Sequence, residues 1–240
     1  MLELRNVTKK FGGLVAVNDL SFKVTQGSMV GLLGPNGSGK STVMNLVSGA
    51  LSHTAGHMFF EGQRIDGRPC HQVARAGIAR TFQLVRLAPS LSVHENVMLP
   101  MAFAGKSFSM AASRDAADDI LERVGLKGQG GRSVNDLNYI DQKRVELARA
   151  ISTNPRLLLL DEWMAGLNPS ELGIAIDLIG SLNGLGTTIL LVEHIMQAVR
   201  ALCPICIVMT AGTKIADGPT ADVLADKQVV DAYLGSAAHA

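Results

Sequence analysis

The stretch GPNGSGKST, residues 34–42, places a glycine, four further residues, a second glycine, a lysine and two hydroxyl residues in succession. This spacing is typical of a loop whose backbone N–H groups converge on phosphate groups. The apolar run 29–33 predicts a buried strand before the loop, and the apolar spacing within 40–48 predicts a helix after it. Lys40 is expected to reach the β and γ phosphates, and Ser41 to bind Mg²⁺. The predicted nucleotide-binding residues of this loop are Asn36, Gly37, Ser38, Gly39, Lys40, Ser41 and Thr42.

Two other kinds of loop share part of this pattern. A glycine-rich turn can bind nothing, and a dinucleotide-binding loop also joins a strand to a helix. The dinucleotide fingerprint requires Gly or Ala where Thr42 stands, and it has no use for Lys40. Phosphate binding therefore accounts best for residues 34–42.

A second motif carries two acids. The four leucines at 157–160 predict a buried strand, and Asp161 and Glu162 follow at its exposed end. We expect Asp161 to hold Mg²⁺ through water and Glu162 to orient or deprotonate an attacking water. A strand followed by two solvated acids is the alternative. The stretch 213–216 fails the guanine-reading tetrad at its fourth position, which favours adenine.

The remaining pattern predicts the fold. Residues 1–30 alternate apolar and polar side chains, as strands do, and short apolar runs at 189–192 and 205–209 repeat the buried-strand pattern. We expect an α/β protein, a P-loop NTPase whose RecA-like core is a largely parallel, doubly wound sheet with an antiparallel β subdomain at the N-terminus. From about 72 to 126 the β pattern is lost, and a helical subdomain is expected to be inserted at about 84–150.

The C-terminal part completes one predicted domain, residues 1–235. A hairpin turn is expected at Ala211-Gly212 and a helix over 219–235, and residues 236–240 are expected to form a mobile tail.

Composition excludes several classes of protein. Of the 240 residues, 47% are hydrophobic and 18% charged, which excludes a disordered chain. The net charge of +1 gives no field that attracts nucleic acid. No apolar run reaches the roughly 20 residues of a membrane span, and the N-terminus lacks a signal peptide, so a cytosolic protein is expected. Cys203 and Cys206 have redox-pair spacing but fit small hydrophobes better, and the histidines and cysteines show no zinc spacing.

The order of these motifs resembles that of the nucleotide-binding subunits of ABC transporters, over essentially the whole chain. The resemblance implies ATP and Mg²⁺ as cofactors. It places Phe11 and Val17 at the nucleotide, with Phe11 stacked on adenine. It implies that Gln83 touches Mg²⁺ and the water and that His194 contacts the γ-phosphate. The implied catalytic residues are Glu162, His194 and Gln83, and the implied Mg²⁺ ligands are Ser41, Gln83 and Asp161.

Three stretches resemble the ATPases of branched-chain amino-acid importers: 80–83 (RTFQ), 165–169 (AGLNP) and 232–235 (AYLG). The resemblance implies an ATP-hydrolysing subunit, peripheral on the cytoplasmic side of the cell membrane. Its implied partners are a second, unlike ATPase subunit in a head-to-tail dimer, transmembrane permease subunits and, indirectly, a solute-binding protein. Relatives that serve urea or short amides share these stretches, so the cargo stays open.

This chain differs from the family at a stretch known as the signature, residues 137–141. Where this branch has Leu-Ser-Tyr-Gly-Gln, the chain reads Leu137-Asn138-Tyr139-Ile140-Asp141. Because this signature serves the γ-phosphate bound by the other protomer, a β-branched side chain and a carboxylate should weaken it. We expect Ile140 to strain the backbone and Asp141 to N-cap the following helix in place of the phosphate. The prediction is a heterodimer with one impaired composite site. The alternative is a nucleotide-dependent switch with little hydrolysis of its own.

Two further residues differ from the family pattern, and the sequence does not explain either difference. Trp163 follows Glu162 where relatives usually have Pro, and Ile195 follows His194 where they often have Asp. Because Trp163 is the only tryptophan, its emission is expected to respond to nucleotide.

Overall fold

The computed structural model describes residues 1–103 and 109–237. Two sheets organise them. An antiparallel sheet has the strand order β2-β1-β4-β5, and a six-stranded sheet has the order β10-β9-β3-β8-β7-β6. The antiparallel strands are β1 (Leu2–Phe11), β2 (Leu14–Val24), β4 (Ala55–Phe60) and β5 (Gln63–Arg64). The strands of the larger sheet are β3 (Met29–Leu33), β6 (Ile78–Arg80), β7 (Leu157–Asp161), β8 (Thr188–Val192), β9 (Ile205–Thr210) and β10 (Thr213–Pro219).

The larger sheet is parallel except at one edge. Strands β9, β3, β8, β7 and β6 run parallel, and β10 pairs with β9 in the antiparallel sense. The carboxyl ends of β6, β7 and β8 therefore meet at one edge, where ligands of such sheets bind. The predicted α/β class, with its antiparallel N-terminal sheet, is confirmed.

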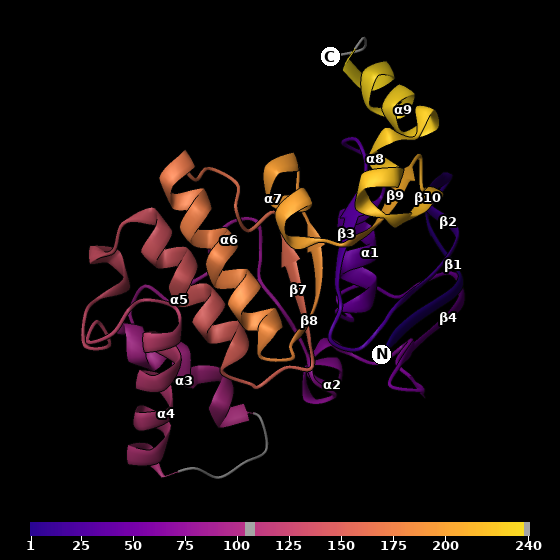
Figure 1. The fold of residues 1–240 in the computed structure, drawn as a ribbon. Helices are drawn as coiled ribbons and strands as arrows, with labels where there is room; N and C mark the ends of the chain where they lie inside the picture. The colour runs from indigo at the N-terminus through magenta and orange to yellow at the C-terminus, as the bar shows by residue number, and fades with distance from the viewer. Residues whose placement is uncertain (104–108, 238–240) are drawn as a thin grey trace.

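Helices cover the larger sheet. Figure 1 shows α5 and α6 on one side of β7 and β8 and the antiparallel strands on the other. Helix α3 contacts both α4 and α5, so these three form one helical group. The helices of the described residues are α1 (Lys40–Val47), α2 (Cys70–Arg75), α3 (Val93–Phe103), α4 (Met110–Arg123), the 3-10 helix η1 (Val134–Asp136), α5 (Tyr139–Ile151), α6 (Pro169–Gly184), α7 (Met196–Leu202), α8 (Thr220–Ala225) and α9 (Lys227–Ala237).

Strand β7 shows how the core is divided. Its leucines alternate, so that Leu157 and Leu159 join the cluster with α1 and the antiparallel sheet, while Leu158 and Leu160 join the cluster with α5 and α6. All four are fully buried. The strand is therefore covered on both faces, which is what its unbroken apolar sequence requires.

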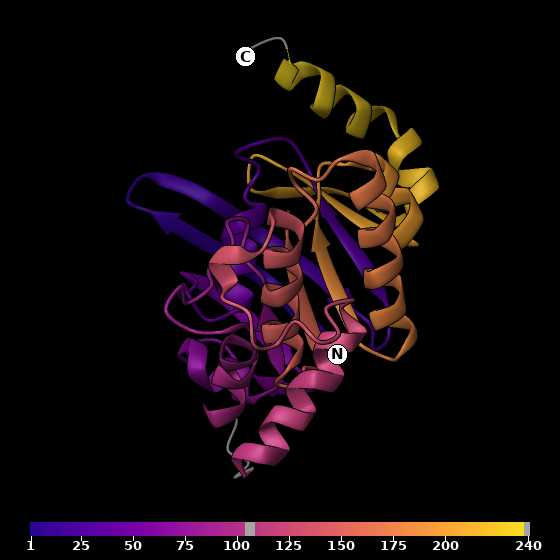
Figure 2. The ribbon, with the colours of Figure 1, turned by 90° about the vertical axis from the view of Figure 1, so that its left-hand side faces the viewer.

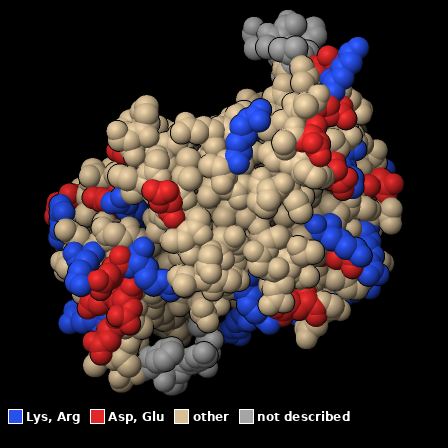
Figure 3. Space-filling view, viewed as in Figure 1, with Lys and Arg blue, Asp and Glu red and all other residues tan. Residues whose placement is uncertain are grey.

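The surface carries no large field of one sign on the face seen in Figure 3, where basic and acidic side chains mix at both ends and the middle is mostly uncharged. In the ranges 1–103 and 109–237, no helix is long and apolar enough to span a membrane.

Figure 2 shows the indigo hairpin of β1 and β2 extending past the helices.

Three expectations about elements need correction. The stretch from 72 to 126 is not free of strands, because β6 lies within it and pairs with β7. The helix expected over 219–235 is two helices, since the backbone is extended at Asp226. Helix α9 continues to Ala237, and residues 238–240 of the expected mobile tail lie outside the described residues.

Candidate active site

The loop at 34–39 joins β3 to α1 and packs tightly against two neighbouring segments. Gly34 and Gly39 have φ values of +147° and +104°. A Cβ atom on Gly34 would lie 2.1 Å from the carbonyl oxygen of Met209, and one on Gly39 would lie 2.5 Å from that of Ala16. Both positions therefore require glycine, for conformation and for space.

Lys40 is the first residue of α1, and its side chain folds back over the loop. Its Nζ donates to the carbonyl oxygens of Gly34, at 2.7 Å, and Pro35, at 3.0 Å. Burial lowers the pKa of Lys40, while the carboxylates of Glu162 and Asp161 oppose that shift. The ammonium group is thus held inside the loop by neutral carbonyls, from which it can move to an entering phosphate.

A cavity of about 450 Å³ opens in front of the loop. Phe11, at the end of β1, and Glu162, directly after β7, both line it. Phe11 is 44% exposed, and the Lys9 ammonium group lies over the Phe11 ring, 4.7 Å from the ring centroid. The predicted loop residues that line the cavity are Asn36, Gly37, Ser38, Gly39, Lys40, Ser41 and Thr42.

Val17 does not line this cavity, contrary to what the family resemblance implied. Its side chain is fully buried in the core cluster shared with α1, because it points to the inner face of β2. The lining from this strand is Leu14, Val15 and Ala16 instead.

The turn between β9 and β10 is a part of the site that sequence reasoning missed. Ala211 and Gly212 line the cavity, and the N–H of Gly212 donates to the carbonyl of Ser38 at 3.0 Å. The turn therefore braces the phosphate loop. The sequence predicted the turn itself, but its contact with the loop depends on the pairing of β3 with β9.

Asp161 ends β7 beside Val192 of β8 and is buried. Nη2 of Arg80, the last residue of β6, donates to Asp161 Oδ2 at 2.7 Å, and Arg80 Nη1 donates to Asn45 of α1 at 2.7 Å. Arg80 therefore connects three elements under the phosphate loop, a role not foreseen from the sequence.

Glu162 stands where three strand ends converge. Its Oε2 accepts a hydrogen bond from Gln83 Nε2 at 2.5 Å, and its Oε1 lies 2.8 Å from His194 Nε2. Gln83 follows β6, Glu162 follows β7 and His194 follows β8, so the order of the parallel strands brings together residues 79 and 32 positions apart. Of the three residues expected to be catalytic, Glu162 thus contacts both of the others.

The backbone at Glu162 is left-handed, with φ of +50°. Such a conformation costs a non-glycine residue roughly 1–2 kcal/mol. The N–H of Glu162 donates to the carbonyl of Val192 at 2.9 Å, which holds the turn. Strain of this kind is typical of residues whose side chains must point into a functional site.

The side chains expected to hold Mg²⁺ fit that ion. Asp161, Ser41 and Gln83 offer carboxylate, hydroxyl and amide oxygens, which are the donors Mg²⁺ prefers. Gln83 uses its NH₂ group on Glu162, so its carbonyl oxygen remains for an ion. Arg80 takes one oxygen of Asp161, and the other has no hydrogen-bond partner among the described residues.

A buried polar layer lies directly behind Glu162. Trp163 is fully buried, and its indole N–H donates to the carbonyl of Lys143 on α5 at 3.2 Å. Glu193 is also buried, and its Oε1 accepts from the N–H of Met164 at 2.7 Å. Burial raises the pKa of Glu193 to about 7, against hydrogen bonds that lower it. Trp163 thus connects the turn that begins at Glu162 to α5. Ile195 packs against the same core.

The signature stretch departs from expectation in two ways. The N-cap of α5 is Asn138, not Asp141: its Oδ1 accepts the N–H of Asp141 at 2.9 Å, because Asn138 is the last extended residue before the helix. Asp141 lies inside the first turn and pairs with Arg144 at 3.0 Å. Ile140 has helical backbone and a buried side chain, so the expected strain is absent there.

The other signature residues take two different environments. Leu137 is buried in the core, whereas Tyr139 is half exposed and lies beside Gly166 of the 165–169 loop.

The sheet order, the phosphate loop and the contact of Glu162 with Gln83 and His194 define a P-loop ATPase of the ABC type. Comparison with known proteins agrees. Residues 17–165 match the ABC transporter family, and residues 213–239 match the family described as branched-chain amino acid ATP-binding cassette transporter. The chain therefore belongs to the ABC transporter family, among the ATP-binding cassettes of the branched-chain amino acid type.

Individual relatives align over nearly the whole chain. The high-affinity branched-chain amino acid transport ATP-binding protein LivG of Escherichia coli is 39% identical over 99% of this chain and 98% of its own. BraF of Pseudomonas aeruginosa, described in the same words, is 38% identical over 99% and 98%. The Nod factor export ATP-binding protein I of Cupriavidus pinatubonensis is 35% identical over 95% of this chain and 69% of its own.

Solved structures show the same fold. The ADP conformation of an ATP-binding cassette of an ABC transporter superposes with a TM-score of 0.88 at 30% identity, over 98% of both chains. A dimeric post-hydrolysis cassette bound to ADP and Pi superposes with a TM-score of 0.83 at 27% identity, over 91% of this chain and 98% of that one.

Proposed function

We propose that this chain is the ATP-hydrolysing subunit of an importer for branched-chain amino acids, bound peripherally at the cytoplasmic side of the membrane. The observation that carries the catalytic part is the contact of Glu162 with Gln83 and His194 beside the phosphate loop. The relatives named for branched-chain amino acid transport support the cargo. Urea and short amides are the alternative cargoes, and uptake measured with each solute distinguishes them.

Each residue of the site has a proposed role. Lys40 exchanges the loop carbonyls for the β and γ phosphates, and Phe11 stacks on adenine. Glu162 orients and deprotonates the attacking water, and His194 steadies the γ-phosphate. Ser41, Gln83 and Asp161 hold Mg²⁺, which neutralises charge on the phosphates when bound.

We further propose a head-to-tail dimer with a second, unlike ATP-binding subunit, docked on permease subunits that receive cargo from a solute-binding protein. The dimeric cassette structure of a relative supports the dimer. In this assembly, residues of about 84–150 form the helical subdomain that moves against the permease, with Gln83 as the connection to the catalytic site.

The dimer is proposed to be asymmetric. Asn138 already accepts an N–H at the start of α5, and Asp141 adds a carboxylate there. Both disfavour a phosphate from the partner at this helix end. The composite site that uses this signature is therefore the impaired one, and the site built on Lys40 and Glu162 is the active one.

A second candidate is a nucleotide-dependent switch with little hydrolysis of its own. The altered start of α5 favours it, because a dimer that closes poorly would hold ATP without cleaving it. ATPase activity measured with and without the partner subunit separates the two functions. Turnover that appears only with the partner supports the transport ATPase, and ATP binding without turnover in both cases supports the switch.

The Glu162→Gln substitution tests the catalytic proposal. Gln keeps the size of the side chain and its contact with Gln83, so ATP binding should persist. Turnover should fall by about a hundredfold or more, since a positioned general base contributes about 10²–10⁴. The exposed Glu122→Gln is the matched control and should leave turnover unchanged. Turnover that survives in Glu162→Gln contradicts the assignment of Glu162 as the base.

A further inference from the structure

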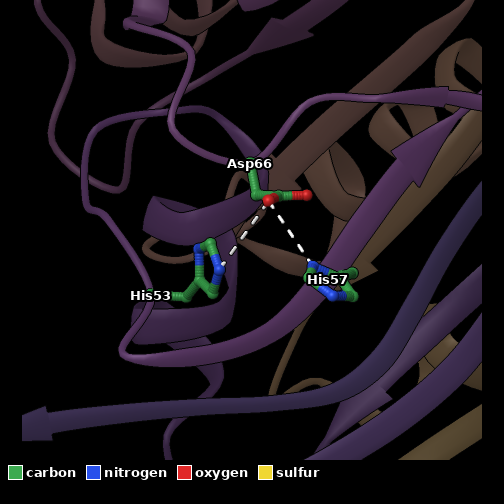
Figure 4. A group of neighbouring side chains, drawn as sticks. All are labelled: His53, His57 and Asp66. Atoms are coloured by element: carbon green, nitrogen blue, oxygen red, sulfur yellow. Dashed lines mark ion pairs between the residues drawn. The ribbon is translucent and has the colours of Figure 1, made fainter.

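A second group of chemistry-bearing side chains lies on the antiparallel sheet. His53 comes from the segment between α1 and β4, His57 lies on β4, and Asp66 follows β5. Figure 4 shows both imidazole rings directed at the carboxylate of Asp66 from two sides. One ligand atom from each residue lies within 4.8 Å of those of the other two. None of these residues lines the cavity in front of the phosphate loop.

The distances do not suit simple hydrogen bonding. His53 Nε2 lies 3.8 Å from Asp66 Oδ2, and His57 Nδ1 lies 3.7 Å from the same oxygen. Both exceed the N···O separation of a hydrogen bond. They are only slightly longer than the span of an ion between the donors: Zn²⁺ lies roughly 2.0–2.2 Å from each nitrogen or oxygen ligand, which in tetrahedral coordination separates two ligands by about 3.3–3.6 Å. A small movement of the side chains would bring both pairs into this range.

The carboxylate is held in place for this role. The side chain of Asp66 is only 4% exposed, and its Oδ1 accepts from the N–H of Met58 at 3.0 Å. Such a second hydrogen bond orients a ligating carboxylate. The imidazoles differ in access, since the side chain of His53 is 15% exposed and that of His57 is 51% exposed. An ion can therefore enter from the side of His57.

One cation competes for the carboxylate. Arg64 Nε donates to Asp66 Oδ2 at 2.7 Å. Its side chain is 59% exposed, so it can turn into solvent when an ion binds.

We propose that His53, His57 and Asp66 bind a divalent transition-metal ion of the Zn²⁺ class, with water completing the coordination. Two imidazole nitrogens and one carboxylate oxygen suit Zn²⁺ and its neighbours rather than Mg²⁺ or Ca²⁺. A bound ion would connect three parts of the chain: the segment after α1, strand β4 and the residues after β5. The effect of binding is therefore to stabilise the antiparallel sheet, independently of ATP.

Zn²⁺ titrated calorimetrically into the full-length, nucleotide-free and chelator-treated chain tests this site. We expect one equivalent to bind and the melting temperature to rise with it. His53→Gln, His57→Gln and Asp66→Asn should each weaken affinity by at least about tenfold, since even outer partners of a metal site contribute about 10–100-fold. Arg64→Gln should tighten binding, because it removes the competing cation.

Matched controls identify the ligands. His94 also pairs with an aspartate, Asp118, and Cys70 is an exposed thiol close in sequence to the site. His94→Gln and Cys70→Ser should leave Zn²⁺ affinity unchanged. Co²⁺ bound in place of Zn²⁺ should give weak d–d absorption without a thiolate charge-transfer band.

His57→Gln is decisive, because His57 is half exposed and its replacement should leave the fold intact, as ATP affinity and circular dichroism will report. No saturable Zn²⁺ binding by the wild-type chain overturns the proposal. Binding that is unchanged in a folded His57→Gln, or lost in Cys70→Ser, also overturns it.

Discussion

At the scale of a residue, the proposed catalytic role of Glu162 depends on its side-chain contacts and its backbone conformation. Its carboxylate accepts from Gln83 and contacts His194, while its own backbone is held in a left-handed turn. The sequence identified Glu162 by its place after four leucines. Gln83 and His194 were identified only by resemblance to a family, because neither has a local pattern that marks it. Their contact with Glu162 depends on strand order.

Glu193, one residue before His194, gives a prediction about pH. Burial raises its pKa to about 7, above the ordinary value of 4.5. The folded state therefore binds more protons than the unfolded state between about pH 4.5 and 7, and stability should fall as pH rises through that window. Glu193→Gln keeps an acceptor for the N–H of Met164 and removes the titration. The variant should be more stable than wild type at pH 8 by about 1–3 kcal/mol, and closer to it at pH 5.

Chemical denaturation at the two pH values measures this difference, with Glu122→Gln as a control in which an exposed carboxylate is lost. An equal difference between Glu193→Gln and wild type at both pH values contradicts a raised pKa.

At the scale of elements, local pattern and long-range pairing contributed differently to what could be predicted. Strand β3, the glycine loop and α1 are contiguous, so their periodicity and spacing sufficed. Strand β6 was not predicted, because its three residues are too few to show the alternation of apolar and polar side chains that marks a strand. It pairs only with β7, which is distant in the sequence. The N-cap of α5 was misplaced by three residues, since Asn138 and Asp141 are both good capping residues by type. The group of His53, His57 and Asp66 was not predicted from the sequence. It contains no cysteine, and its third member is nine residues from the second.

The link between the turn that begins at Glu162 and α5 leads to a prediction at this scale. Trp163 is fully buried, and its indole N–H adds a second hydrogen bond to the carbonyl of Lys143, which also accepts within helix α5. Trp163→Phe removes the indole hydrogen bond between the residue after Glu162 and α5 and creates a cavity, so the free energy of unfolding should fall by about 2 kcal/mol or more. Denaturant unfolding measures it, with the exposed Phe103→Leu as control. A loss below about 0.5 kcal/mol would show that Trp163 does not secure α5.

At the scale of the whole molecule, the proposed asymmetry between the two nucleotide sites is argued from the positions at which the chain departs from the signature that the family resemblance implies. By that resemblance the phosphate loop, Asp161, Glu162 and His194 match the expected pattern, and the start of α5 does not. Replacing Lys40 with Ala in the assembled complex should therefore reduce ATP turnover on the order of a hundredfold. Replacing the matching loop lysine of the partner subunit should reduce it far less. Equal losses from the two substitutions would contradict an asymmetric dimer.

The most direct test of the central claim is ATP-driven leucine uptake by the complete transporter reconstituted in liposomes. With Mg²⁺ and ATP on the side of this chain, the wild-type complex should accumulate leucine, and the complex with Glu162→Gln should bind ATP but accumulate almost none. Uptake that continues undiminished with Glu162→Gln, or uptake that does not require ATP and Mg²⁺, would contradict it.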